Sequence, residues 1–250
     1  MAKAPVISDR QQIRTVLAHY EKKQTLVSGF LNAVLAHVNE SEALMTLAHS
    51  IKHRIKDPDH LADKIQRKIT KAREEGKRYV ITPNNLFDKI RDLAGIRILH
   101  LHTSQLPAID RELQAIIREQ KFKLVEGPFA RTWDDEYREY YESIGVTPQK
   151  SPNMYTSIHY VIASGSETTV NCEIQVRTLM EEVWGEVDHQ INYPKPHANL
   201  ACREQILALA RVTSSATRLV DSIFASVADY SKQNAKSRSR RIIKKSKKRA

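Results

Sequence analysis

The chain has 250 residues, of which 41% are hydrophobic, and its net charge is +11. This composition is typical of a folded protein with one sizeable core. It excludes a membrane span, because no apolar run is long enough to cross a bilayer, and the first residues lack a signal peptide's apolar segment. Two cysteines are too few for a disulfide framework, so we expect a reducing, cytoplasmic setting.

The apolar pattern predicts an α+β fold, a mixed sheet packed with helices. In chain order, the predicted elements are helices over 9–50 and 58–75, a strand over 92–102, a helix over 104–120, strands over 121–129, 155–163 and 169–176, and helices over 179–190 and 198–231. Thr178 and Glu181 fit a capping box at the start of the helix 179–190. An apolar stripe predicts which side of this helix faces the core, and it consists of Leu179, Val183 and Val187 with Met180 and Trp184 beside them.

The positive charge is concentrated near the end of the chain. Residues 236–249 contain nine Lys or Arg and no acid, and the remainder has 31 basic and 29 acidic residues. A basic segment of this kind either contacts RNA or another anionic surface, or is a solvated, disordered end. Both interpretations remain open.

Polar and apolar residues alternate along the last two predicted strands. Cys172, Ile174 and Val176 share one face of the strand 169–176, whereas the other face carries Asn171, Glu173, Gln175 and Arg177. In the preceding strand, the polar face carries Tyr155, Ser157 and His159. Neighbouring strands with this alternation predict a sheet that has one polar face available for a site.

Two further polar clusters lie at predicted element boundaries. Arg54, Lys56 and Lys64 precede or enter the second predicted helix, where cations do not stabilise the helix start but suit a polyanion such as a triphosphate. Asp92 stands at the mouth of a buried strand that contains Arg97, and this acid is a Mg²⁺ ligand, a helix cap or a salt-bridge partner. Two carboxylates on separate strands with converging cations are typical of phosphoryl transfer.

From about residue 51 to 193, these clusters resemble the synthetase domain of the RelA/SpoT-type alarmone synthetases, also called GTP pyrophosphokinases. Members of this family transfer the β,γ-pyrophosphate of ATP to the 3′-hydroxyl of GDP or GTP and release AMP. The resemblance implies a nucleotidyltransferase-like fold, Mg²⁺ as cofactor, and ATP with GDP or GTP as partners. Small members often form tetramers, so a homo-oligomer is also considered.

The resemblance implies that two motifs bind ATP, the pyrophosphate donor, on what is called here the donor side of the site. In "RIK" and the following helix, Arg54 is expected to stack on adenine, and Lys56 and Lys64 to contact phosphates. In "DLAGIRI", Asp92 is expected to bind Mg²⁺, with Arg97 as a nearby cation that contacts ATP.

The acceptor side is implied by two other motifs. In "NMYTSIHY", Tyr155 is expected to stack on the acceptor base, with His159 close behind. In "EIQVRT", Glu173 is the second catalytic and metal-binding carboxylate. Gln175 and Lys150 complete the expected acceptor site.

The sequence departs from the family at three places. Met154 stands where the family has glycine, His60 replaces a common serine, and Lys150 lies five rather than four residues before Tyr155. The acceptor therefore stays open between guanine nucleotides, adenine nucleotides and the tRNA 3′ end that toxin-type members modify. A third hypothesis is a catalytically weak nucleotide sensor or RNA-binding protein.

The expected organisation is that of a synthetase-only enzyme, because no His-Asp pair of the family's hydrolase domain precedes the motifs. We expect a helical segment over 1–50, the synthetase domain over 51–195, a packed helix over 196–234 and a basic, disordered tail over 235–250.

Overall fold

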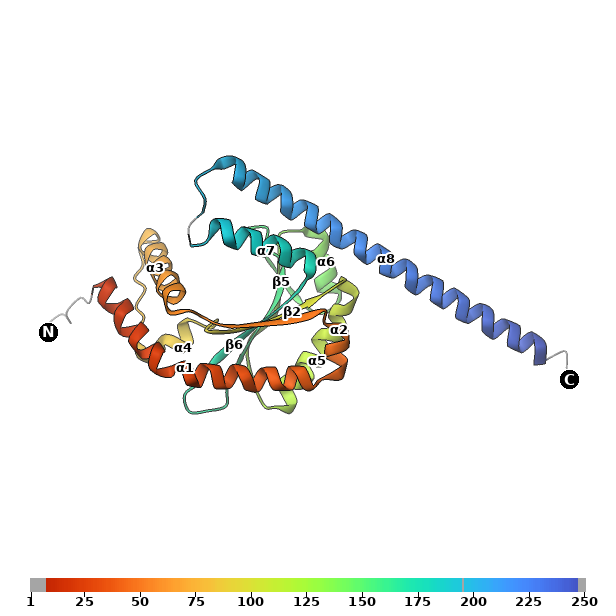
Figure 1. The fold of residues 1–250 in the computed structure, drawn as a ribbon, viewed down its shortest axis with the longest axis horizontal. Coiled ribbons are helices and arrows are strands. Elements are labelled where there is room, and N and C mark those ends of the chain that lie inside the picture. Colours follow the sequence, from red (N-terminus) through yellow and green to blue (C-terminus); the bar gives the residue numbers. More distant parts are fainter. Residues whose placement is uncertain (1–7, 195, 247–250) are drawn as a thin grey trace.

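A six-stranded mixed sheet with helices on both faces forms the body of the computed structural model (Figure 1), which describes residues 8–194 and 196–246, with side chains as far as 235. Its longer elements are, in chain order, α1 (Asp9–Glu40), α2 (Glu42–Leu47), β1 (Ser50–Ile55), α3 (Pro58–Glu74), α4 (Leu86–Lys89), β2 (Ala94–His100), α5 (Leu106–Glu119), β3 (Lys123–Thr132), α6 (Asp135–Ser143), β4 (Thr147–Lys150), β5 (Ser157–Ala163), β6 (Asn171–Thr178), α7 (Leu179–Asn192) and α8 (Leu200–Ser246). The expected α+β class is confirmed. No helix within the described ranges is long and apolar enough to cross a membrane.

The strand order β1-β2-β6-β5-β3-β4 brings the predicted motifs onto adjacent strands. β2 and β6 are parallel, with Gly95 opposite Glu173 and Arg97 opposite Gln175. β5 runs antiparallel to β6 and places His159 opposite Gln175. Because side chains alternate between the faces of a strand, these polar residues meet on one face of the sheet.

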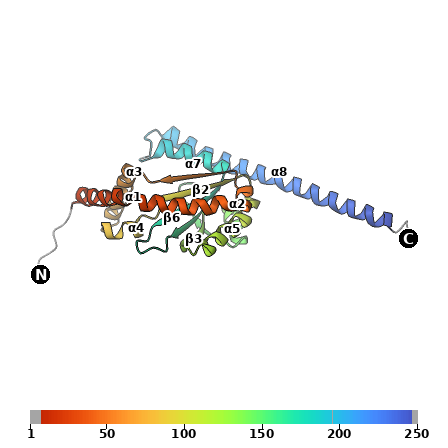
Figure 2. The ribbon, with the colours of Figure 1, turned by 60° about the horizontal axis from the view of Figure 1, so that its bottom comes forward.

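The other face of the sheet is apolar and is covered by α1 and α5 (Figures 1 and 2). Both helices are amphipathic, and the buried residues of α5 follow the spacing expected of one helical face, namely Leu106, Ile109, Leu113 and Ile117. They pack in the same core cluster as Cys172, Ile174 and Val176 of β6. The predicted inward face of this strand is therefore confirmed.

α7 covers the polar face, and the first part of α8 packs against α7 (Figure 1). The predicted capping box is confirmed, because Thr178 Oγ1 accepts a hydrogen bond from Glu181 N at 3.2 Å and Glu181 Oε2 accepts one from Thr178 N at 2.7 Å. The predicted orientation of α7 is right for Trp184, which is 4% exposed, but wrong for Val183 and Val187, which are 52% and 38% exposed. The sheet face beneath α7 is polar, so the helix turns a charged side toward it.

Two strands and several boundaries differ from the sequence prediction. β1 and β4 were not predicted, and the helix expected over 9–50 ends at Glu40, where Ser41 caps the short α2. α8 runs through Ser246, well beyond the expected end at about 231.

The expected disordered tail, 235–250, is accordingly helical as far as Ser246. No glycine or proline follows Pro196, and lysine and arginine are good helix formers, so nothing in this segment interrupts the helix. Residues 247–250 lie outside the described ranges, as do the side chains from 236 on. Nucleic-acid contact by this basic segment stays a prediction.

Candidate active site

The polar face of the sheet opens into a cleft of about 730 Å³ beneath α7. Eight of the ten predicted site residues line it: Arg54, Lys64, Asp92, Arg97, Tyr155, His159, Glu173 and Gln175. Lys56 lines an adjoining hollow of about 370 Å³ together with Asp92. Lys150 is exposed at the end of β4 and does not line either space. Four separate motifs are thus brought together, and the role expected for Lys150 stays a prediction.

Asp92 lies just before β2 and holds two lysines. Its Oδ1 is 2.7 Å from Lys64 Nζ and its Oδ2 is 3.0 Å from Lys56 Nζ. Burial alone would raise the pKa of this carboxyl, but the two lysines outweigh burial and lower the pKa to about 2. Asp92 is therefore a carboxylate at neutral pH.

Local structure explains how the two lysines reach Asp92. Asp57 caps α3, accepting a hydrogen bond from Asp59 N at 2.8 Å, and Pro58 occupies the first turn. This fixes the start of the helix and places Lys64 near Asp92. The Lys56 carbonyl accepts a hydrogen bond of 2.6 Å from the Tyr20 hydroxyl of α1, which ties the segment to the core.

Glu173 is oriented by two neighbours on the sheet. Its Oε1 lies 3.1 Å from His159 Nδ1, and its Oε2 accepts a hydrogen bond of 2.8 Å from Gln175 Nε2. Burial favours a raised pKa, but the hydrogen bond and charge of His159 together with Lys64 outweigh it, and the pKa of Glu173 is lowered. His159 and Lys64 thus keep this second carboxylate ionised, and the hydrogen bond from Gln175 holds it in place.

Gly127 allows β3 to lie directly against the backbone of His159. A Cβ at this position would lie far inside van der Waals distance of the His159 carbonyl oxygen, and its φ is +89°. Only glycine combines both conditions. β3 therefore packs directly on the backbone that positions His159.

The loop before β5 carries Tyr155 against α7. The Tyr155 ring centroid lies 6.5 Å from that of Trp184 and 5.8 Å from the guanidinium carbon of Arg177. Met154 has a positive φ of 57°, the conformation that glycine adopts most readily. Its side chain packs with Trp184 and Ile206, so packing holds a backbone conformation that methionine disfavours.

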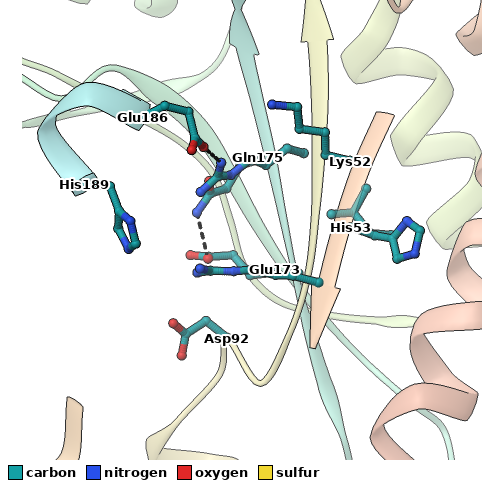
Figure 3. A pocket seen from close by; sticks show the side chains of 11 residues that line it. Lys52, His53, Asp92, Glu173, Gln175, Glu186 and His189 are labelled. Atoms are coloured by element: carbon teal, nitrogen blue, oxygen red, sulfur yellow. Dashed lines mark hydrogen bonds and ion pairs between the residues drawn. The ribbon is translucent and has the colours of Figure 1, made fainter. Parts of the chain in front are cut away.

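α7 supplies acidic residues that the sequence analysis did not assign to the site. Arg97 Nη1 contacts Glu186 and lies 3.3 Å from Glu182 Oε1. Figure 3 shows Asp92 and Glu173 pointing into the same space, with Glu186 nearby and His189 across from them. The sequence could have indicated that these residues share a side of α7, because Glu182, Glu186 and His189 have the i, i+4, i+7 spacing of one helical face.

Asp92 and Glu173 are suitable for a metal ion that arrives with phosphates. Within the described residues, no group of three or more His, Cys, Asp or Glu side chains is placed to hold a metal by itself. Mg²⁺ typically takes one or two carboxylates and completes its shell with phosphate oxygens and water. Two ionised carboxylates lining one cleft, with lysines beside them, fit that requirement.

Comparisons with known proteins agree with this arrangement. Residues 53–198, more than half of the chain, match the family model described as a region found in RelA/SpoT proteins. GTP pyrophosphokinase YwaC of Bacillus subtilis (strain 168) is 23% identical over 199 residues, covering 75% of this chain and 81% of that protein.

Solved structures share the fold. A GTP pyrophosphokinase family protein from Streptococcus pneumoniae superposes with a TM-score of 0.53 at 17% identity, covering 85% of this chain and 92% of that one. Small alarmone synthetase 1 from Bacillus subtilis, bound to its product pppGpp, gives a TM-score of 0.51 at 17% identity, covering 87% and 98%.

Proposed function

The chain belongs to the RelA/SpoT family, and on this basis we propose that it is a Mg²⁺-dependent GTP pyrophosphokinase that makes (p)ppGpp from ATP and GDP or GTP. The observation that carries the proposal is the pair of ionised carboxylates, Asp92 and Glu173, in one cleft with converging cations. The similar proteins named GTP pyrophosphokinase and alarmone synthetase support the same reaction.

The donor nucleotide binds at β1, β2 and α3. Arg54 and Arg97 line the same cleft as Asp92. Arg54 stacks on the adenine, a contact that suits its planar guanidinium group, and Arg97 faces the phosphates. Lys56 and Lys64 lie within 3.0 Å of Asp92 and neutralise the phosphate chain. Asp92 and Glu173 would hold Mg²⁺, which would supply electrostatic stabilisation of the charge that develops on the phosphate oxygens.

The acceptor binds on the other side of Glu173. Tyr155 stacks on the base, and His159 and Gln175 keep the Glu173 carboxylate directed into the cleft. Glu173 accepts the hydrogen bond of the acceptor's 3′-hydroxyl. Its lowered pKa makes it a weak base at neutral pH, so its main contribution is to orient the attacking oxygen.

The reaction is a substitution at the β-phosphorus of ATP. The 3′-oxygen forms a bond to this phosphorus, the bond from it to the bridging α,β-oxygen breaks, and AMP leaves with that oxygen. The hydroxyl proton leaves the attacking oxygen along the hydrogen bond to Glu173. Lys56, Lys64 and Arg97 stabilise the charge during transfer. Residues 51–195 supply every group that this proposal uses.

The direct test incubates the purified chain with ATP labelled at the β-phosphate and Mg²⁺, offering GDP, GTP, ATP and tRNA in parallel. We expect label on GDP or GTP with equal release of AMP. Label only on tRNA would reject the proposed acceptor and implicate the basic segment of residues 236–249. Absence of label on all four acceptors would reject pyrophosphoryl transfer altogether.

A further inference from the structure

Glu182 of α7 is a buried carboxylate that the proposed reaction does not use. Its side chain is 6% exposed, and it faces three cations. They come from three neighbouring strands: Lys52 Nζ of β1 at 2.9 Å, Arg97 Nη1 of β2 at 3.3 Å, and Arg177 Nη2 of β6 in direct contact. A single acid therefore joins three adjacent strands of the polar sheet face to α7.

One of these cations belongs to the donor side of the cleft. Arg97 lines the cleft with Arg54 and Asp92. Burial would lower the pKa of Arg97, but the charge of Glu182 and the hydrogen bond to Glu186 raise it. Glu186 is a more exposed second partner, at 43%. The position of Arg97 thus depends on two carboxylates, of which only Glu182 is buried.

A second cation supports the acceptor side. The Arg177 side chain is 2% exposed, and its guanidinium carbon lies 5.8 Å from the centre of the Tyr155 ring. α7 passes so close that a Cβ on Gly185 would lie 2.7 Å from Arg177 Nη1. Glycine in a helix interior disfavours the helix, and the space it leaves for Arg177 explains its presence here.

We propose that Glu182 is a positioning residue that holds Arg97 on the donor side and Arg177 on the acceptor side, so that both substrates depend on one carboxylate. This inference rests on the proposed function, because it assigns Arg97 to ATP and Tyr155 to the acceptor. Glu182 is the acid in ion-pair contact with Arg177 among the described side chains, whereas Glu181 acts on Arg177 only through its charge. Without the charge of Glu182, the buried Arg177 loses that ion pair and repels Arg97. Both arginines then shift away from their substrate-binding positions.

The test compares E182Q with E186Q, a matched control that carries the same change one helical turn further along. Glu186 contacts Arg97 but not Arg177. We expect E182Q to raise the KM of ATP and the KM of the nucleotide acceptor, each by roughly tenfold or more. E186Q should raise only the KM of ATP, by about threefold or less because its side chain is partly exposed. An unchanged acceptor KM in E182Q would overturn the inference.

A second variant tests the acceptor side without removing a charge. G185A adds a methyl group against Arg177 and favours the helix, so it should raise the acceptor KM and leave the KM of ATP unchanged. If E182Q does not fold, the acceptor KM of G185A is the test of the inference. A wild-type acceptor KM in G185A would overturn it.

A measurement without turnover separates this inference from the proposed function. In the absence of substrates, amide hydrogen exchange of residues 152–156 should be faster in E182Q than in E186Q, because Arg177 supports Tyr155. If the wild type labels no acceptor, the proposed function fails, and the hydrogen-exchange comparison alone tests whether Glu182 positions Arg177. Equal exchange in the two variants would overturn the inference.

Discussion

Replacing Asp92 with asparagine should have opposite effects on stability and on metal-free nucleotide binding. The carboxylate holds Lys56 and Lys64 at 3.0 and 2.7 Å, and Lys56 is buried. Asparagine keeps the shape but removes the charge, so both lysines lose their counter-ion. The folded protein is destabilised, and a bound polyanion becomes a better partner for the two lysines.

The size of the stability change follows from the pKa of Asp92. This pKa is lowered from 3.8 to about 2, and at about 1.4 kcal/mol per pKa unit the ionised carboxylate stabilises the fold by roughly 2 to 3 kcal/mol. Because the folded pKa lies below the unfolded value, this stabilisation is complete above about pH 4 and is lost as pH falls through about 2. The difference between wild type and Asp92→Asn should therefore be constant near neutral pH and shrink only below pH 4.

Urea denaturation at pH 7 measures this difference. A loss under about 0.5 kcal/mol would refute the assigned role of the two lysines, since a loss that small is typical of an exposed ion pair. In thermal denaturation, ATP without Mg²⁺ should stabilise Asp92→Asn more than wild type, because the repulsion between Asp92 and the phosphates is gone. A smaller ATP-induced shift in the variant would contradict this electrostatic argument.

Three further predictions concern the acceptor side. Glu173→Gln should lower kcat by about 10² to 10³-fold, while ATP without Mg²⁺ should still bind when measured by calorimetry. Loss of this metal-free binding would contradict an orienting role. In urea denaturation, Met154→Gly should lower the free energy of unfolding less than Met154→Ala does. At a φ of 57°, alanine retains a backbone strain of about 1 kcal/mol that glycine avoids. The reverse order would refute strain at this residue. Gly127→Ala should destabilise by more than about 2 kcal/mol, because its methyl group meets the His159 carbonyl; a cooperative melt at the wild-type temperature would refute that clash.

The sequence pattern was sufficient for the elements whose signals are local. The capping box of Thr178 and Glu181 depends on residues three positions apart, and it forms as predicted. The alternation of polar and apolar residues in β6 can also be recognised without knowing the neighbouring strand, because the apolar residues are the ones that enter the core. The motifs with Arg54, Asp92, Tyr155 and Glu173 were predicted to share a site, and the structure brings them to one cleft.

Edge strands could not be predicted in this way. β1 and β4 lie at the two edges of the sheet, and β1 has only two apolar residues, Ile51 and Ile55. A short strand of this composition is stable because it pairs with a neighbour. That neighbour, β2, is distant in sequence, so the pairing that makes the strand is invisible in the segment itself.

The sequence by itself determined that Thr178 caps the start of α7, that β6 has a polar face, and that two carboxylates and several cations belong together. Only the tertiary structure decided which side of α7 meets the sheet. A pattern of apolar residues predicts burial of Val183 and Val187 if the surface beneath is apolar. Here that surface carries Lys52, Arg97 and Arg177 from three strands, and a buried cation requires an opposing charge. The helix therefore buries Glu182 and leaves its valines exposed.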